Sequence, residues 1–107
     1  MKINIMKESI PYITDVTIAG ATFQFEFTYN SYDKRVYVTL YDIDDNLIYP
    51  NEPILFGIPL WFNKLVDEKG NFNKKYPQKY IIPNTLDRKA LKIDYENIDK
   101  IELLVED

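Results

Sequence analysis

The chain of 107 residues contains no cysteine and no histidine. These absences exclude disulfide bonds, thiolate nucleophiles, imidazole acid–base catalysis and the usual structural zinc sites. Only three glycines are present, widely separated, so no glycine-rich loop can cradle a phosphate group. No apolar run is long enough for a signal peptide or a membrane-spanning helix. We therefore expect a protein that is made in a cytosol, is not secreted by a signal peptide and uses no cofactor.

The residues that are present are typical of a folded globular protein. Hydrophobic residues make up 46% of the chain and aromatic residues 15%, which is too apolar for a disordered chain. A length of 107 residues allows one core but not two, so we predict a single β domain over residues 1–107. Nine tyrosines outnumber six phenylalanines. Tyrosine suits half-buried sheet faces and interfaces, because its ring is apolar while its hydroxyl needs a partner.

The chain is organised around a unit at residues 21–60 that consists of two paired strands, a turn and a third extended segment. Phe23, Phe25 and Phe27 alternate with polar residues, and this period of two predicts a strand with one buried face. After a turn, the run Arg35–Asp42 is dense in β-branched and aromatic residues and predicts an antiparallel return strand.

The two faces of this return strand differ in character. Val36, Val38 and Leu40 are predicted to face the core. Tyr37 and Tyr41 then lie on the opposite face. Two tyrosines on that face indicate either a second layer above the sheet or contact with another chain.

Weaker patterns complete the prediction. They indicate an edge strand at 2–6, an extended segment at 10–18 with Ile13, Val16 and Ile18 in the core, an acidic turn at 42–46, a strand at 47–49, a loop at 51–53, a strand at 80–83 ended by proline, and an interior strand at about 100–106. Residues 62–92 are loop-rich and basic. The predicted fold class is all-β, a small antiparallel β-barrel or β-sandwich of about six to eight short strands with little or no helix.

Charge is distributed unevenly along the sequence. Residues 64–92 carry eight basic and three acidic side chains, whereas the remainder carries five basic and fourteen acidic ones. The net charge of -4 therefore combines a segment of about +5 with a remainder of about -9. This pattern indicates either a solvated surface whose signs happen to segregate or electrostatic docking to a partner.

Two groups of acidic residues have a spacing that could carry chemistry. Asp42, Asp44 and Asn46 have the oxygen spacing that begins a calcium loop, but Leu47 replaces the required glycine and Pro53 the bidentate glutamate. An acidic hairpin turn explains the run better. Acid–base catalysis by two carboxylates requires that they be held on opposite sides of a cleft. Nothing in the sequence positions the pairs Asp44 and Asp45 or Glu96 and Asp99 in that way. We therefore expect no metal site and no enzymatic activity.

A small single-stranded nucleic-acid-binding β domain is the alternative function. Such proteins stack bases on exposed sheet aromatics beside a positive groove. The phenylalanines of the aromatic strand are better explained as core, and its opposite face carries Glu26. The net charge also has the wrong sign for neutralising a phosphate backbone.

The order of several elements resembles the small baseplate plug proteins of contractile phage tails. The resemblance is carried by an aromatic strand ending Tyr29-Asn30, the return strand Arg35–Asp42, the turn Asp45-Asn46 leading to Leu47-Ile48, the motif Gly57-Ile58-Pro59-Leu60, and the final apolar strand Ile101–Val105. Residues 49–56 look like an insertion relative to that family, and residues 62–88 do not align with it.

The resemblance implies a structural component of the central hub of a contractile tail, in a phage or a phage-tail-like bacteriocin. Its partners would be hub, tube or spike proteins, in a symmetric assembly of several copies within a virion or tail-like particle built in a bacterial cytoplasm. No catalytic, metal or cofactor residue accompanies the resemblance. From exposed-aromatic and charge reasoning, the interface candidates are Tyr37, Tyr41, Tyr49, Trp61, Lys74 and Lys75.

Overall fold

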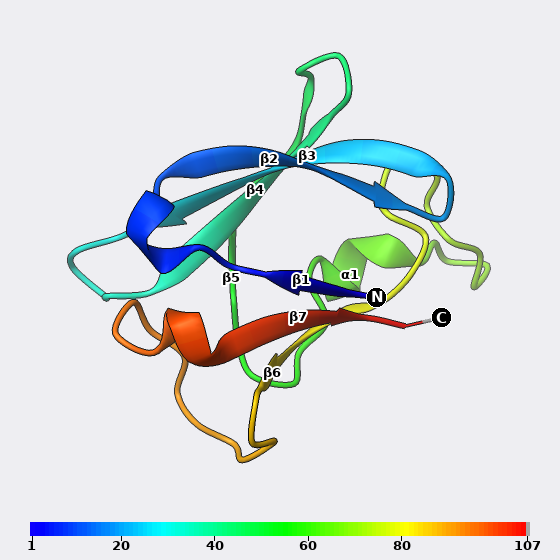
Figure 1. The fold of residues 1–107 in the computed structure, drawn as a ribbon. Helices are drawn as coiled ribbons and strands as arrows, with labels where there is room; N and C mark the ends of the chain where they lie inside the picture. Colours follow the sequence, from blue (N-terminus) through cyan, green and yellow to red (C-terminus); the bar gives the residue numbers. More distant parts are fainter. Residues whose placement is uncertain (107) are drawn as a thin grey trace.

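The computed structural model describes residues 1–106, which form two antiparallel sheets that face one another (Figure 1). One sheet has the order β1-β7-β6, with β1 at Lys2–Asn4, β6 at Ile81–Thr85 and β7 at Ile101–Val105. The other has the order β2-β3-β4-β5, with β2 at Tyr12–Ile18, β3 at Ala21–Tyr29, β4 at Val36–Asp42 and β5 at Leu47–Pro53. The sheets do not close into a barrel. The predicted all-β class is confirmed.

Helical structure in residues 1–106 is limited to three short pieces. They are the 3-10 turns η1 at Lys7–Ser9 and η2 at Ile98–Lys100, and the single α-helical turn α1 at Phe62–Leu65. Leu65 is the buried residue of α1, and it anchors that turn against the core. None of these pieces, within residues 1–106, has the length and apolar character needed to cross a bilayer.

The central pair of strands confirms the period-two prediction. β3 and β4 pair antiparallel in an unbroken register from Phe23 opposite Asp42 to Tyr29 opposite Val36. Phe25 and Phe27 are 0% exposed, as is Val38 on the neighbouring strand. The alternating side chains of the two strands therefore build the centre of one apolar core, to which both sheets contribute.

The short β1-β7-β6 sheet closes the other side of this core. β7 lies between β1 and β6, and Ile101, Leu103 and Val105 are buried, as expected for an interior strand. Glu102 on its other face is also buried, and its carboxylate lies 3.4 Å from the ammonium of Lys2 on β1. The predictions of an edge strand near the amino terminus and an interior strand at the carboxyl end are confirmed.

Three local predictions were wrong. In β2, the side chains of Val16 and Ile18 point into the core. Successive side chains of a strand alternate between its two faces, so Ile13 lies on the outer face and is 52% exposed. The predicted loop at 51–53 is the end of β5, which pairs with β4 through an irregular register. β6 does not end at Pro83: the strand continues to Thr85, because Pro83 lies on an edge strand where its missing N–H is tolerated.

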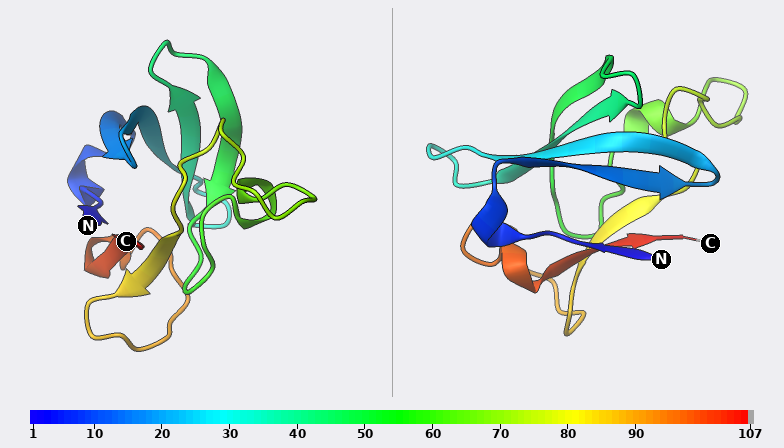
Figure 2. Two further views of the ribbon diagram at one scale, coloured as in Figure 1. Left: turned by 90° about the vertical axis from the view of Figure 1, so that its right-hand side faces the viewer. Right: turned by 45° about the horizontal axis from the view of Figure 1, so that its top comes forward.

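A connection after β5 joins the two sheets along one side. The N–H of Gly57 donates to the carbonyl of Pro83 and that of Leu60 to the carbonyl of Ile81, both at 2.9 Å. This green segment passes from the four-stranded sheet to β6 in both views of Figure 2. The opposite side, between β1 and β2, has no such backbone bridge within residues 1–106.

Candidate interaction surfaces

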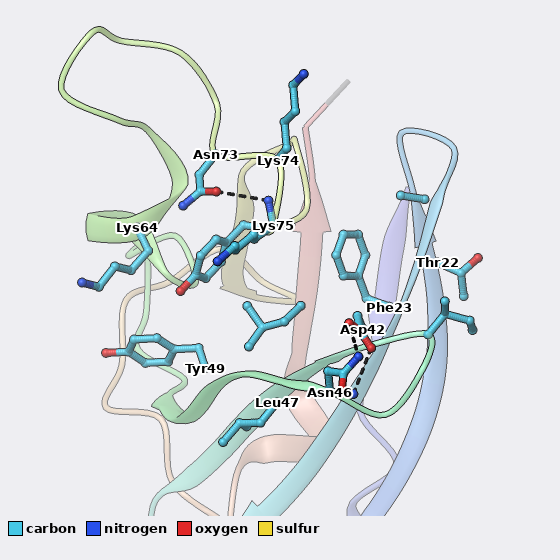
Figure 3. A pocket seen from close by; sticks show the side chains of 14 residues that line it. Thr22, Phe23, Asp42, Asn46, Leu47, Tyr49, Lys64, Asn73, Lys74 and Lys75 are labelled. Carbon is cyan, nitrogen blue, oxygen red and sulfur yellow. Dashed lines mark hydrogen bonds between the residues drawn. The ribbon is translucent and has the colours of Figure 1, made fainter.

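A groove of about 850 Å³ lies between the β3-β4-β5 region and residues 64–76. Figure 3 shows its lining. Apolar rings and chains from Phe23, Ile48, Tyr49 and Tyr76 form its walls, and three lysines stand on its rim: Lys64, Lys74 and Lys75. We call this the lysine groove. It brings together three of the predicted interface residues, Tyr49, Lys74 and Lys75.

The basic rim is held by its backbone. The N–H of Asn73 donates to the carbonyl of Leu65 at 2.7 Å, which ties the rim to the buried residue of the helical turn α1. The side-chain oxygen of Asn73 accepts from the N–H of Lys75 at 3.1 Å, the dashed contact in Figure 3. Lys64 and Lys74 direct their ammonium groups outward from the groove. The rim therefore offers positive charge to an approaching partner and does not enclose a single small anion.

The opposite wall contains the acidic hairpin turn after β4. The carboxylate of Asp42 accepts from the N–H of Asp44 and the N–H of Asn46, both at 2.9 Å, and from Asn46 Nδ2 at 3.0 Å. The backbone hydrogen bond from Asn46 is the main cause of a pKa for Asp42 below its ordinary value. The prediction of an acidic hairpin turn is confirmed. Within residues 1–106 no group of three or more acidic side chains is arranged to hold a metal ion.

Two predicted interface tyrosines lie elsewhere, on the outer face of β4. The hydroxyl of Tyr41 donates to Oε1 of Glu26 at 3.0 Å, and that of Tyr37 donates to the carboxylate of Asp33. Each hydrogen bond to a carboxylate raises the pKa of its tyrosine. Thr39 lies between them and is only 5% exposed. The two rings are half-buried and fixed, which limits the conformational entropy they would lose on binding a partner.

The sixth candidate, Trp61, does not lie on the surface. It is 2% exposed, and its ring packs edge to face on Phe25 with centroids 5.4 Å apart. Its backbone has a φ of 56°, and its N–H donates to the carboxylate of Glu52. The exposed-aromatic reason for proposing Trp61 as an interface residue was wrong. It fills the core beneath the connection between the sheets.

Glu52 is the half-buried acid of this region. Burial is the main cause of a pKa above the ordinary glutamate value, partly offset by the hydrogen bond from the N–H of Trp61. Burial also raises the pKa of Tyr76, with smaller contributions from nearby Tyr49 and Glu52. Tyr76 is 6% exposed, so the groove wall at this residue is poorly solvated.

A cluster of tyrosines at the end of the β3–β4 hairpin was not foreseen. Tyr32 in the turn is 97% exposed, and Tyr29 is 41% exposed. The rings of Tyr29 and Tyr95 lie 4.5 Å apart, and the ammonium of Lys7 lies 5.1 Å from the Tyr95 ring centre. Together with Tyr37, the first two border a second hollow of about 540 Å³. The available sequence signal was a tyrosine within the turn-prone run at 30–33, where no core could accept its ring.

The basic segment does not form one continuous surface. Its first part, at residues 64–75, borders the lysine groove. Its last part, at residues 86–92, follows β6 and lies on another side of the molecule in the views of Figures 1 and 2. Phe23, Phe25 and Phe27 are core residues with 6% exposure or less. Phe23 reaches the lysine groove, but none of the three rings offers an exposed face on which a base could stack.

The chain was compared with known protein families and curated proteins. The model of a family described as "Cyanophage baseplate Pam3 plug gp18" matches residues 1–106. No curated protein matches the chain. The family match extends through residues 49–56 and 62–88, the parts that the sequence resemblance left unaligned.

Proposed function

The chain belongs to the family of the cyanophage Pam3 baseplate plug gp18, and we propose that it is a structural plug in the central hub of a contractile tail. A structural role in a phage baseplate, with other baseplate proteins as partners, follows from the family. The finer proposal is that the chain helps to close the end of the tail tube or bridges hub and spike components. It would act there in several symmetry-related copies, without catalysis, in a phage or a phage-tail-like bacteriocin assembled in a bacterial cytoplasm.

The observation that carries this proposal is the family match over residues 1–106, which leaves no large segment of the chain outside it. The surfaces are compatible with an assembly role. A fully exposed tyrosine, two half-buried tyrosines held by carboxylates and a lysine-rimmed apolar groove are features found at protein–protein contacts. The half-buried acid Glu52 accepts a hydrogen bond from the backbone N–H of Trp61.

We assign partner contacts to three places. They are the outer face of β4 with Tyr37 and Tyr41, the lysine groove with Tyr49, Lys74 and Lys75, and the tyrosine cluster with Tyr32. The outer face of β4 and the tyrosine cluster adjoin at Tyr37, which lines the same hollow as Tyr32, whereas the lysine groove has a separate set of lining residues. The chain therefore offers two separate contact areas and can contact more than one neighbour at once. That property suits a plug surrounded by hub subunits. Trp61 is not included, because it is buried.

Fractionation of the producing cell tests the proposal. A cleared lysate is separated on a density gradient, and the chain is followed across the fractions by peptide mass spectrometry. The proposal expects the chain in the fast-sedimenting particle fractions, at a constant ratio to tube and hub proteins. Recovery of the chain solely at the top of the gradient, while tube proteins sediment as particles, would overturn it.

A further inference from the structure

One edge of the strand β2 has no strand paired with it among residues 1–106. β2 is the outermost strand of the four-stranded sheet and pairs solely with β3. Within residues 1–106, no backbone hydrogen bond joins Tyr12–Ile18 to any segment other than β3. In the described part of the chain, no side chain donates a hydrogen bond to the β2 backbone or accepts one from it. A row of N–H and C=O groups is therefore left without a protein partner.

The β2–β3 turn identifies these groups. Ala19 and Gly20 form a two-residue connection with φ values of 52° and 81°, the backbone of a tight hairpin turn. In such a hairpin the closing pair, Ile18 and Ala21, exchanges hydrogen bonds, and the pairs then alternate along the ladder. Counting back from this pair, the N–H and C=O groups of Ile13, Asp15 and Thr17 point away from β3 towards the free edge.

A groove lies along this edge. It has a volume of about 470 Å³ and lies between β2 and β1, the outer strand of the other sheet. Val16 and Ile3 contribute buried apolar chains to its lining, whereas Met1 and Met6 are 57% and 54% exposed. Methionine side chains adapt their shape to an apolar partner. The groove thus combines an unpaired backbone on one wall with adaptable apolar side chains.

The remaining outer strands are protected, whereas β2 is not. β5 is irregular and contains Pro50 and Pro53, β1 is three residues long, and the edge of β6 accepts hydrogen bonds from Gly57 and Leu60. Bulges, prolines and short strands are common devices that prevent edge-to-edge pairing. β2 pairs with β3 over seven residues without a register shift and contains no proline.

A second copy of this chain is a poor occupant of the edge. An antiparallel pair of β2 strands must place outward-pointing residues opposite each other. The register that pairs all seven residues then sets Asp15 of one copy directly opposite Asp15 of the other. Like charges opposite one another destabilise a strand pair, and the chain also has a net charge of -4. The charge of Asp15 instead favours a basic residue on the incoming strand.

We propose that β2 receives an extended segment of another baseplate protein, which adds as a strand beside Tyr12–Ile18 and fills the groove against β1. The segment carries a basic residue opposite Asp15 and apolar residues towards Val16 and the two exposed methionines. It closes the open side of the two-sheet fold. The added strand also covers Ile13, an exposed aliphatic residue that the fold alone does not use. This inference rests on the proposed baseplate role, since a neighbouring baseplate protein supplies the strand.

Amide hydrogen exchange tests it in the wild-type chain, both free and within purified particles. In the free chain, the N–H groups of Ile13, Asp15 and Thr17 exchange fast, whereas those of Thr14 and Val16, bonded to β3, are protected. In the particle, the three outward amides slow by about 100-fold or more, as expected for newly formed ladder hydrogen bonds. Exchange is read at single-residue resolution by fragmentation after quenching.

The outcomes separate the inference from the function on which it rests. If the chain is in the particle and the three amides exchange as fast as in the free chain, strand addition is wrong while the plug role stands. Absence of the chain from particles overturns both. Protection of the same amides in the free chain, increasing with its concentration, would instead assign the edge to a second copy and contradict our choice of partner.

A pair of variants adds an independent readout. Asp15→Pro removes one outward N–H together with the side-chain charge, whereas Asp15→Asn removes the charge and keeps that N–H, so the two variants differ in the backbone hydrogen bond. Each is co-expressed with the wild-type chain, and the peptide ratio in particles is compared with that in the lysate. We expect incorporation of Asp15→Pro to fall at least 10-fold relative to Asp15→Asn, with retained exchange protection of β3 and β4 showing that both variants fold. Equal incorporation of two folded variants would overturn strand addition.

Discussion

The ring of Trp61 meets the ring of Phe25 edge to face, with centroids 5.4 Å apart and an interplanar angle of 82°. This contact joins the connection after β5 to the central strand of the four-stranded sheet. Both side chains are almost fully buried, at 2% and 0% exposure. The aromatic residue that the sequence suggested for a partner surface is therefore a core residue.

Replacing Trp61 by alanine should cost about 3–5 kcal/mol in the free energy of unfolding, the usual range for deleting a large buried aromatic. The adjacent Phe62, 54% exposed, provides the matched control, and Phe62→Ala should change the stability by about 0.5 kcal/mol or less. Urea unfolding followed by far-ultraviolet circular dichroism measures both. Equal effects of the two substitutions would contradict the burial assigned to Trp61.

The β2–β3 turn should accept a stabilising substitution. Ala19 has a φ of 52°, a region that asparagine tolerates better than alanine, and it precedes Gly20 in a turn that favours Asn-Gly. Ala19→Asn is expected to raise the free energy of unfolding by roughly 0.5–1 kcal/mol. Ala90→Asn, at an exposed loop position, is the control and should be neutral. A loss of stability in Ala19→Asn alone would show that this turn does not have the assigned backbone.

Glu52 should give a distinct dependence of stability on pH. Its pKa is raised by burial in the folded chain and is ordinary in the unfolded chain, so the folded state holds a proton that the unfolded state has lost. The contribution of Glu52 to stability therefore falls as pH rises from the ordinary glutamate pKa through the raised one.

The variant Glu52→Gln removes that titration and can still accept the hydrogen bond from the N–H of Trp61. We expect the stability of Glu52→Gln relative to wild type to increase between about pH 4 and pH 7, the range just above an ordinary glutamate pKa. The exposed Glu68→Gln should show no such trend. Urea midpoints measured across this pH range provide the comparison, and parallel curves for wild type and Glu52→Gln would contradict the assignment.

Charge reversal of the lysine groove should weaken incorporation into particles. The triple change Lys64→Glu, Lys74→Glu and Lys75→Glu reverses its rim, whereas the same change at Arg88, Lys89 and Lys92 alters the net charge equally on another side of the molecule. In co-expression with the wild-type chain, we expect about 10-fold lower incorporation of the groove variant, because complementary charge increases the rate of correct docking. Equal incorporation of both triple variants would exclude a specific role for the groove.

The sequence predicted those elements whose signal is local. The alternation of Phe23, Phe25 and Phe27 was enough to orient β3, and the β-branched run from Val36 was enough to orient β4. The acidic turn after β4 was also predicted, because Asp42 and Asn46 can satisfy the turn backbone with their own side chains.

The errors arose where distant segments determine the outcome. Trp61 is buried because its ring packs against Phe25, which is far away in the sequence. Pro83 does not end β6, because β7 pairs with one side of the strand and the connection with the other. The rings of Tyr29 and Tyr95 meet only because the β3–β4 hairpin packs against the segment at Tyr95, whose N–H donates to the carbonyl of Lys34. Such long-range packing has no signature in the local sequence.

An image reconstruction of the particle by electron cryomicroscopy tests the central claim most directly. The account predicts that density in the core of the baseplate, at the end of the tail tube, fits the two-sheet fold of this chain. Tyr37, Tyr41, Tyr49 and the lysine groove should face neighbouring chains there. A baseplate whose central density is fully explained by other proteins, with this chain absent from it, would contradict the account.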